Sequence, residues 1–183
     1  MEWFRKLVRT NTPLEDQSNF MGAGCIFTNQ THVLAGFHPN KKIPNISGFG
    51  GKREGNETYT QAALRETLEE LFHIKPASLD LIKLIEANLK PGHILKQKTK
   101  EGLYYILHYT FEDLKLILKF ASLYCVDTPL YEKWPTNVQR LIFYRKMEKS
   151  SEISQLCLLP FIENITVDEN FKKDLCGLKV SSE

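Results

Sequence analysis

The sequence predicts an α+β fold, with strands and helices packed in a sandwich-like α/β/α arrangement. Strand-like and helix-like segments are mixed along the chain, without the strict β-α-β alternation of a doubly wound parallel sheet. The chain also lacks a GxGxxG motif between a strand and a helix, which argues against a Rossmann dinucleotide site. Its 183 residues can bury a core, and no repeat or linker divides them, so we expect one domain over residues 1–183.

The first predicted strands are two short apolar segments joined by a polar turn. Their sequences are GAGCIFTN and HVLAGFH, and the residues QT between them favour an antiparallel hairpin. A loop rich in glycine and proline follows, and then a helix from about Thr58 to Phe72. Further strands are predicted around LDLIKLIEA and LYYILHYTF. The expected order is therefore β-β-loop-α-β-β.

The later part of the chain gives weaker patterns. The segment EDLKLILKFASL fits a helix or a strand equally well. The segment TNVQRLIFYRKME favours a helix, because it follows Trp-Pro and because Thr136 can serve as its N-cap. Residues 156–180 give no firm prediction.

The composition is that of an ordinary soluble protein, with 42% hydrophobic and 25% charged residues. The net charge of +2 gives no bulk electrostatic reason to bind long nucleic acid or an anionic membrane. The four cysteines form no CxxC or Cys/His pair, so we expect free thiols in a reducing compartment. No apolar segment is long enough to span a bilayer, and we expect a cytoplasmic location, no membrane contact and no obligate protein partner.

Three glutamates on the predicted helix form the first candidate site. Glu66, Glu69 and Glu70 stand at positions i, i+3 and i+4, so they share one narrow sector of the helix. The opposite sector carries the apolar residues Leu64, Leu68, Leu71 and Phe72. Such acids are often simply solvated, but together they repel one another, and a divalent cation reverses that repulsion. Mg²⁺ prefers carboxylate oxygens, water and phosphate, so we expect a Mg²⁺ site, with Mn²⁺ as a substitute.

A glycine-rich segment precedes the helix directly. Gly48, Gly50, Gly51 and Gly55 let the backbone turn tightly, approach the helix and expose N–H groups to phosphate oxygens. The glycines and the acids together therefore indicate a clamp for a metal ion and a phosphate.

The same residues resemble the signature box of the Nudix, or MutT-like, hydrolase family. Gly51 is followed after five residues by Glu57, and then after seven residues by RETLEE, a match over about a seventh of the chain. The resemblance implies a Nudix-type α/β/α sandwich with a mixed β-sheet and a loop-helix-loop catalytic motif. It also implies that Glu66, Glu69 and Glu70 bind metal, and that Glu57 and Arg65 brace the loop against the helix.

One position departs from the family pattern. Nudix members have glycine shortly after the paired glutamates as a left-handed helix C-cap, whereas this chain has Phe72 and His73. We expect a longer or differently ended helix that still binds metal.

The resemblance implies attack by an activated water on a phosphoanhydride bond of a nucleotide. Glu69 and Glu70 are the first candidates for close catalytic work, with Glu57 and Arg65 in support. Family members often add an acid from a later loop as a ligand or base. Glu112, after the strand LYYILHYTF, is our candidate for that metal-binding role, and Glu101 is second.

A finer similarity concerns the branch that hydrolyses oxidised purine nucleoside triphosphates to monophosphate and pyrophosphate. The segments GFGGK and PLYEKWP are similar to that branch, in which the Trp of the Trp-Pro pair stacks on the base. Thr136 and Asn137 stand where the branch has two base-reading Asp residues, and Ser47 stands where it has Asn, so the match is partial. The expected substrate-binding residues are Ser47, Gly50, Gly51, Lys52, Trp134, Thr136 and Asn137.

The sequence therefore predicts a Mg²⁺-dependent pyrophosphohydrolase that cleaves a nucleoside triphosphate to nucleoside monophosphate and pyrophosphate. Its expected partner is a small nucleotide. Modified or oxidised purine nucleotides, the substrates of the oxidised branch, are among the candidates. Hydrolysis of an mRNA cap, or of another nucleoside-diphosphate-linked substrate, stays open, because the scattered lysines do not decide whether capped RNA can bind. A nucleotide-sensing module without turnover is the alternative outside enzymes, although it would be expected to lose one of the acids.

Overall fold

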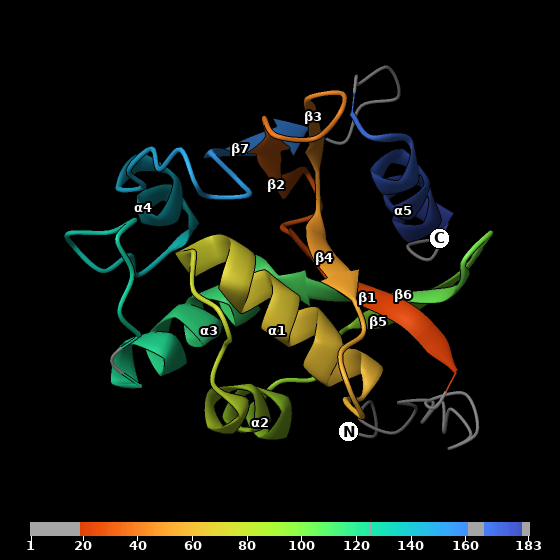
Figure 1. The fold of residues 1–183 in the computed structure, drawn as a ribbon, viewed down its shortest axis with the longest axis horizontal. Coiled ribbons are helices and arrows are strands. Elements are labelled where there is room, and N and C mark those ends of the chain that lie inside the picture. Colours follow the sequence, from red (N-terminus) through yellow and green to blue (C-terminus); the bar gives the residue numbers. More distant parts are fainter. Residues whose placement is uncertain (1–18, 125, 161–166, 181–183) are drawn as a thin grey trace, which may run out of the picture.

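The computed structural model describes residues 19–124, 126–160 and 167–180. The strands in chain order are β1 (Phe20–Thr28), β2 (His32–His38), β3 (Asn45–Ser47), β4 (Phe49–Lys52), β5 (His93–Thr99), β6 (Gly102–Thr110) and β7 (Gln155–Pro160). The helices are α1 (Tyr59–Phe72), α2 (Leu79–Asn88), α3 (Phe111–Leu123), α4 (Val138–Phe143) and α5 (Glu169–Val180). This order confirms the α+β class (Figure 1).

All the described strands belong to one mixed sheet. Its main path runs β3-β2-β1-β6-β5, with β4 paired to β1 and β7 paired to β2. β1 is antiparallel to β2 and β4 but parallel to β6, with Cys25 opposite Leu107. The predicted hairpin of the first two strands is therefore confirmed.

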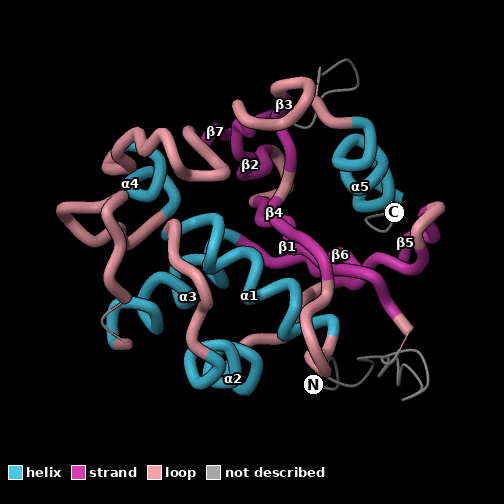
Figure 2. Tube along the Cα trace, viewed as in Figure 1, coloured by secondary structure: helices cyan, strands magenta, loops and turns pink. Residues whose placement is uncertain are grey.

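Helices cover both faces of this sheet, because alternate residues of a strand point to opposite faces. Ala23, Cys25 and Phe27 of β1 face a core shared with α1, α2, α3 and α4. Ile26 faces a second cluster with Phe171 and other residues of α5. Figure 2 shows α1 and α5 on opposite sides of β1 and β6, which confirms the predicted sandwich.

Helix α1 begins as the sequence predicts. Thr58 accepts a hydrogen bond from the Gln61 N–H, and the Gln61 side chain accepts one from the Thr58 N–H, which forms a capping box. The helix ends at Phe72, where His73 adopts the left-handed conformation with φ 50° and ψ 50°. The helix end differs from the family pattern as expected, since it includes Phe72 and His73 takes the left-handed conformation that glycine usually supplies.

Two segments have a different secondary structure from the prediction. LDLIKLIEA is the helix α2 and not a strand, because Ser78 caps its first turn and the buried residues Leu81, Ile82 and Ile85 follow helical spacing. The glycine-rich loop contains the two strands β3 and β4, because the small residues let β4 lie close against β1. The ambiguous EDLKLILKFASL forms α3.

The remaining predictions are partly corrected. Helix α4 is shorter than predicted, and its N-cap is Asn137, whose side chain accepts from the Arg140 N–H, and not Thr136. Cys25, Cys157 and Cys176 are free thiols, whereas Cys125 lies outside the described residues. Within the described ranges, no helix has both the length and the apolar character needed to cross a bilayer.

Candidate functional site

Strand β4 and helix α1 meet directly at two glycines. A Cβ on Gly51 would lie 2.4 Å from the carboxyl group of Glu66, so any larger residue here would displace this carboxyl group. The N–H of Gly50 donates a hydrogen bond of 3.0 Å to Oε2 of Glu70. The predicted proximity of the glycine segment and the acidic helix is therefore present.

Arg65 joins the same two segments. Its Nε and Nη2 donate to the two carboxylate oxygens of Glu57 at 2.9 and 2.8 Å, and Nη2 also donates to the Lys52 carbonyl at 2.8 Å. The hydrogen bonds to Glu57 raise the pKa of this guanidinium above its ordinary value. A planar guanidinium suits this two-pronged contact, and its position matches the bracing role that the resemblance implied.

The three glutamates of α1 have different surroundings. Glu69 accepts hydrogen bonds from the Ala77 N–H at 3.1 Å and from Nη1 of Arg65 at 3.4 Å, so it holds the segment that follows the helix. Glu66 is half-buried and accepts from the same Arg65 nitrogen at 2.9 Å. Glu70 is only 5% exposed, and the Gly50 N–H is the hydrogen-bond donor to its carboxylate.

The surroundings raise the pKa of two of these carboxylates, Glu66 and Glu70. Burial, followed by the negative charge of Glu152, raises the pKa of Glu70 well above its usual range. Burial also raises the pKa of Glu66, although Arg65 opposes this effect. A divalent cation would remove both penalties, because it compensates the negative charge inside the cavity.

A cavity of about 320 Å³ lies over these acids. It is lined by Glu66, Glu69, Glu70, His73, Ile74, Lys75, Ser150, Ser151 and Glu152. Glu70, Glu152 and His38 bring one ligand atom each to within 4.8 Å of one another, as a metal site requires. Carboxylate oxygens and an imidazole are suitable donors, so the residues present fit a divalent cation.

Sequence reasoning missed Glu152 and His38. Glu152 stands in the loop before β7, in a short segment to which the sequence analysis assigned no element, and His38 is the last residue of β2. Arg145 holds the Glu152 loop against α1, since its Nη2 donates to the carbonyls of Glu70 and Ile153 at 3.1 and 2.8 Å. No local pattern marked either residue, because the strand that follows Glu152 was not predicted and His38 is a single histidine at a strand end.

Glu112 does not belong to this cavity, so its predicted metal-binding role is corrected. The helix α3 starts directly after β6, capped by Thr110, and leaves no loop that could carry Glu112 back to α1. Its side chain is 83% exposed and forms an ion pair with Lys115 at 3.3 Å. Glu101, the second candidate, lies in the turn between β5 and β6 and does not line the cavity either.

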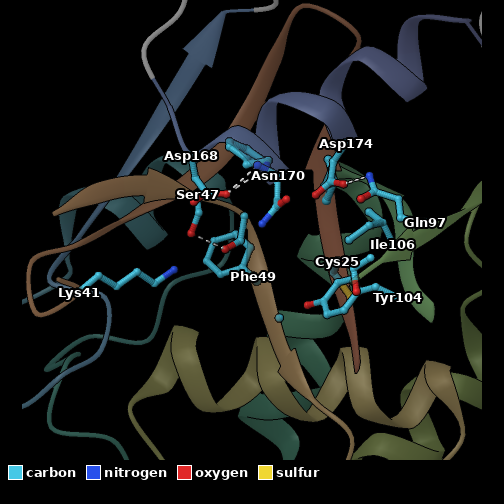
Figure 3. A pocket seen from close by; sticks show the side chains of 15 residues that line it. Cys25, Lys41, Ser47, Phe49, Gln97, Tyr104, Ile106, Asp168, Asn170 and Asp174 are labelled. Carbon is cyan, nitrogen blue, oxygen red and sulfur yellow. Dashed lines mark hydrogen bonds between the residues drawn. The ribbon is translucent and has the colours of Figure 1, made fainter. Parts of the chain in front are cut away.

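A second cavity, of about 240 Å³, lies between the sheet and α5 (Figure 3). Ser47 and Gly50 line it from the glycine segment, while Asp168, Asn170 and Asp174 line it from the α5 region. Gln97 donates a hydrogen bond to Asp174, and burial raises the pKa of this acid to about 7. Gly50 links the two cavities, because it lines the second and donates its N–H to Glu70, which lines the first.

The predicted base-stacking residue Trp134 lies elsewhere. Its ring stacks on Phe72, with centroids 4.9 Å apart and planes at 19°, and its Nε1–H donates to the Leu118 carbonyl at 2.9 Å. Trp134 and Thr136 line a separate cavity with Glu112, which none of the α1 acids reaches. Asn137 caps α4, so the structure does not bring these three residues to the acids.

The other predicted substrate contacts divide between the two sites. Ser47 and Gly50 line the second cavity, and Gly51 packs on Glu66. Lys52 is exposed, and its carbonyl accepts from Arg65.

Comparison with solved structures finds partial similarity at low sequence identity. A bifunctional NMN adenylyltransferase/ADP ribose pyrophosphatase from Francisella tularensis, complexed with AMP and a Mn ion, is 12% identical with a TM-score of 0.48 over 90% of this chain. The alignment spans 42% of that longer protein. A NUDIX family hydrolase from Clostridium perfringens is 14% identical with a TM-score of 0.44, covering 90% of this chain and 99% of its own. The NUDIX domain of Shewanella oneidensis NrtR, complexed with ADP ribose, is 11% identical with a TM-score of 0.43, over 94% and 95% of the two chains.

No curated protein matches the sequence. The sequence model of the NUDIX domain, however, matches residues 19–118, a range that includes β1, the glycine segment and the acids of α1. This match covers more than half of the chain and confirms the resemblance of the signature box, so the chain belongs to the Nudix hydrolase family.

Proposed function

We propose that the protein is a divalent-metal-dependent pyrophosphohydrolase that converts a purine nucleoside triphosphate to nucleoside monophosphate and pyrophosphate. One observation carries the proposal: Gly50 lines the cavity beside α5 and donates its N–H to Glu70 in the acidic cavity. A nucleoside in the cavity beside α5 and its phosphates over the acids would therefore lie on either side of this one backbone position.

The acidic cavity supports the metal requirement. Glu66, Glu70 and Glu152 are the carboxylates that would hold Mg²⁺, since they gather there and burial raises the pKa of Glu70 and Glu66. A bound cation of this kind supplies charge compensation for the phosphates and makes water more acidic.

Glu69 is the proposed acceptor of the proton that the attacking water loses. Its Oε1 accepts from the Ala77 N–H, while the contact of its Oε2 with Arg65 is long, at 3.4 Å. Each carboxylate oxygen has two lone pairs, so Oε2 retains capacity to accept a proton from the cavity. The contacts with Ala77 and Arg65 hold the carboxylate in place for that transfer.

The cavity beside α5 supports a purine as the base. Ser47, Gln97 and Asn170 offer groups that donate and accept hydrogen bonds, as the two sides of a purine edge require. Asp174, with a pKa of about 7, can present either a carboxylate or a neutral carboxyl donor. Lys41 at the cavity wall adds a positive charge close to where phosphates would leave it.

The test is a panel of unmodified and oxidised purine nucleoside triphosphates, dinucleoside polyphosphates, nucleotide sugars and capped RNA, with Mg²⁺ present. We expect pyrophosphate release from a purine nucleoside triphosphate, and Glu70→Gln should lower kcat by about 100-fold or more, because it removes a carboxylate from the acid cluster. Glu112→Gln is the matched control, since that exposed side chain lies outside the cavity, and it should leave the rate unchanged.

Two outcomes would contradict the proposal. Equal rates for the wild type and Glu70→Gln on every compound would contradict the proposal that the acids of α1 catalyse hydrolysis. Turnover confined to capped RNA or to nucleoside-diphosphate-linked compounds would support the hydrolase activity but contradict the proposed triphosphate substrate.

A further inference from the structure

We propose that His38 is a nitrogen ligand of the divalent cation at Glu70 and Glu152, so that this site binds Mn²⁺ or a similar transition-metal ion in preference to Mg²⁺. This inference rests on the metal site of the proposed function. It goes beyond the signature box, because β2 lies outside the glycine segment and the acids of α1 that the box contains.

The first observation is the convergence of three segments that are far apart in the sequence. His38 ends β2, Glu70 lies in the last turns of α1, and Glu152 precedes β7. One ligand atom from each lies within 4.8 Å of the other two. Two ligand atoms on opposite sides of one ion are about 4.2 Å apart. A small movement of the exposed Glu152 side chain would therefore bring all three ligand atoms within bonding distance of one ion.

The second observation is the state of the imidazole itself. His38 is 2% exposed, and within the described part of the chain neither Nδ1 nor Nε2 makes a hydrogen bond of ordinary geometry, although the Gly48 backbone lies near enough to act on the pKa of the ring as a hydrogen-bond acceptor. A buried polar group without a partner costs free energy, so such groups usually have a function or an additional ligand. A metal ion at the acids would satisfy one of the two nitrogens.

The backbone keeps this imidazole in place. His38 pairs with Asn45 in the ladder between β2 and β3, and β2 is held on its other side by β7. The ring therefore sits on a sheet strand and not on a loop, which gives a metal ligand the rigidity that it needs.

The ligand types decide which cation the site prefers. Mg²⁺ favours an all-oxygen environment and keeps several waters, whereas an imidazole nitrogen suits transition metals. A set of two carboxylates and one imidazole therefore favours Mn²⁺ over Mg²⁺.

Electron spin echo envelope modulation of the Mn²⁺-loaded full chain, without nucleotide, tests the coordination directly. A coordinated imidazole gives ¹⁴N modulation of the Mn²⁺ echo, and we expect this modulation in the wild type. Labelling histidine with ¹⁵N should change it. His38→Gln should abolish the modulation and weaken Mn²⁺ binding by about tenfold or more in calorimetry, with a much smaller effect on Mg²⁺.

His73→Asn is the matched control. His73 lines the same cavity, and asparagine tolerates the left-handed conformation at this position. The modulation should persist in this variant. Its loss in His73→Asn with persistence in His38→Gln would transfer the ligand role to His73 and overturn the proposal.

The spectra of the wild type and of His73→Asn together decide the question even if His38→Gln does not fold. A Mn²⁺-loaded wild type without ¹⁴N modulation would overturn the ligand role of His38, and hydrolysis that depends on Glu70 would then leave the proposed function intact. Conversely, ¹⁴N modulation without turnover of any nucleotide would support the ligand role and contradict the proposed function.

Discussion

Burial determines what each glutamate of α1 can do. Glu69 and Glu70 are neighbours in the sequence and both are largely buried. Among the described residues, Glu69 accepts two hydrogen bonds, from Ala77 and Arg65, and Glu70 accepts one, from Gly50. The remaining lone pairs of Glu70 face a cavity that contains Glu152. Without a cation, Glu70 therefore destabilises the fold whenever it is ionised.

This situation predicts a pH-dependent stability of the metal-free protein. The pKa of Glu70 in the folded state lies well above its ordinary value of 4.5. Between these two pKa values the folded state binds more protons than the unfolded state, so the free energy of unfolding falls as the pH rises. In EDTA, Glu70→Gln should have a higher Tm than the wild type at about pH 7.5, by about 2–4 °C for each ~1 kcal/mol relieved.

Differential scanning fluorimetry across pH measures this difference. The advantage of Glu70→Gln should shrink as the pH falls and should vanish below pH 4.5, where the wild-type carboxyl is protonated in both the folded and the unfolded state. Added Mn²⁺ should raise the Tm of the wild type and not that of the variant. A wild type that is more stable than Glu70→Gln in EDTA at neutral pH would contradict this account of the buried acid.

At the scale of elements, Arg145 connects the end of α1 to the loop that carries Glu152. The last carbonyls of a helix have no intrahelical donor, and Nη1 and Nη2 of Arg145 donate to those of Leu71 and Glu70 at 2.6 and 3.1 Å. Nη2 also donates to the Ile153 carbonyl at 2.8 Å. One side chain thus terminates the acidic helix and places the additional acid beside it.

Replacement of this arginine should loosen the Glu152 loop. Arg145→Lys keeps the positive charge but cannot reach three carbonyls with a planar fork, so we expect a loss of about 1–3 kcal/mol in unfolding free energy. Mn²⁺ affinity measured by calorimetry should fall about tenfold, because Glu152 would no longer be held near Glu70.

Arg140→Lys is the control for the loss of an arginine fork. The exposed Arg140 side chain donates to Thr136 at the surface, and its replacement should change neither quantity. If Arg145→Lys binds Mn²⁺ as tightly as the wild type does, the loop is positioned by other contacts.

Secondary structure was predictable where local signals agreed, and α2 shows where they did not. Its apolar residues are dense enough to read as a buried strand, and only the Ser78 cap and the spacing of Leu81, Ile82 and Ile85 distinguish a helix. Helix α1 was predicted correctly, because its Thr58 cap and its apolar face point to the same structure.

At the scale of the whole molecule, the sheet brings together residues that no local pattern could connect. Glu57, Arg65 and the three acids of α1 were predictable, because the spacing along one helix and its preceding loop sets their positions. His38 and Glu152 lie beside Glu70 only because β2 pairs with β7, which is a tertiary contact. The cavity that we propose for the nucleoside likewise depends on the packing of α5 against β1 and β6, whereas the sequence predicted a base contact at Trp134.

The packing of α5 makes a prediction about substrate affinity. Figure 3 shows the Asn170 side chain at the cavity beside Ser47 and Asp168, and Asn170 is exposed, so it is free to contact a ligand. If this cavity receives the base, Asn170→Ala removes one hydrogen bond and should raise KM about tenfold, with little change in kcat, since the acids of α1 are untouched. Steady-state kinetics on the best triphosphate of the panel measures both constants. Glu169→Ala changes the neighbouring exposed position, which does not line the cavity, and should leave KM unchanged. An unchanged KM in Asn170→Ala, with a melting temperature equal to that of the wild type, would show that the base binds outside the α5 cavity.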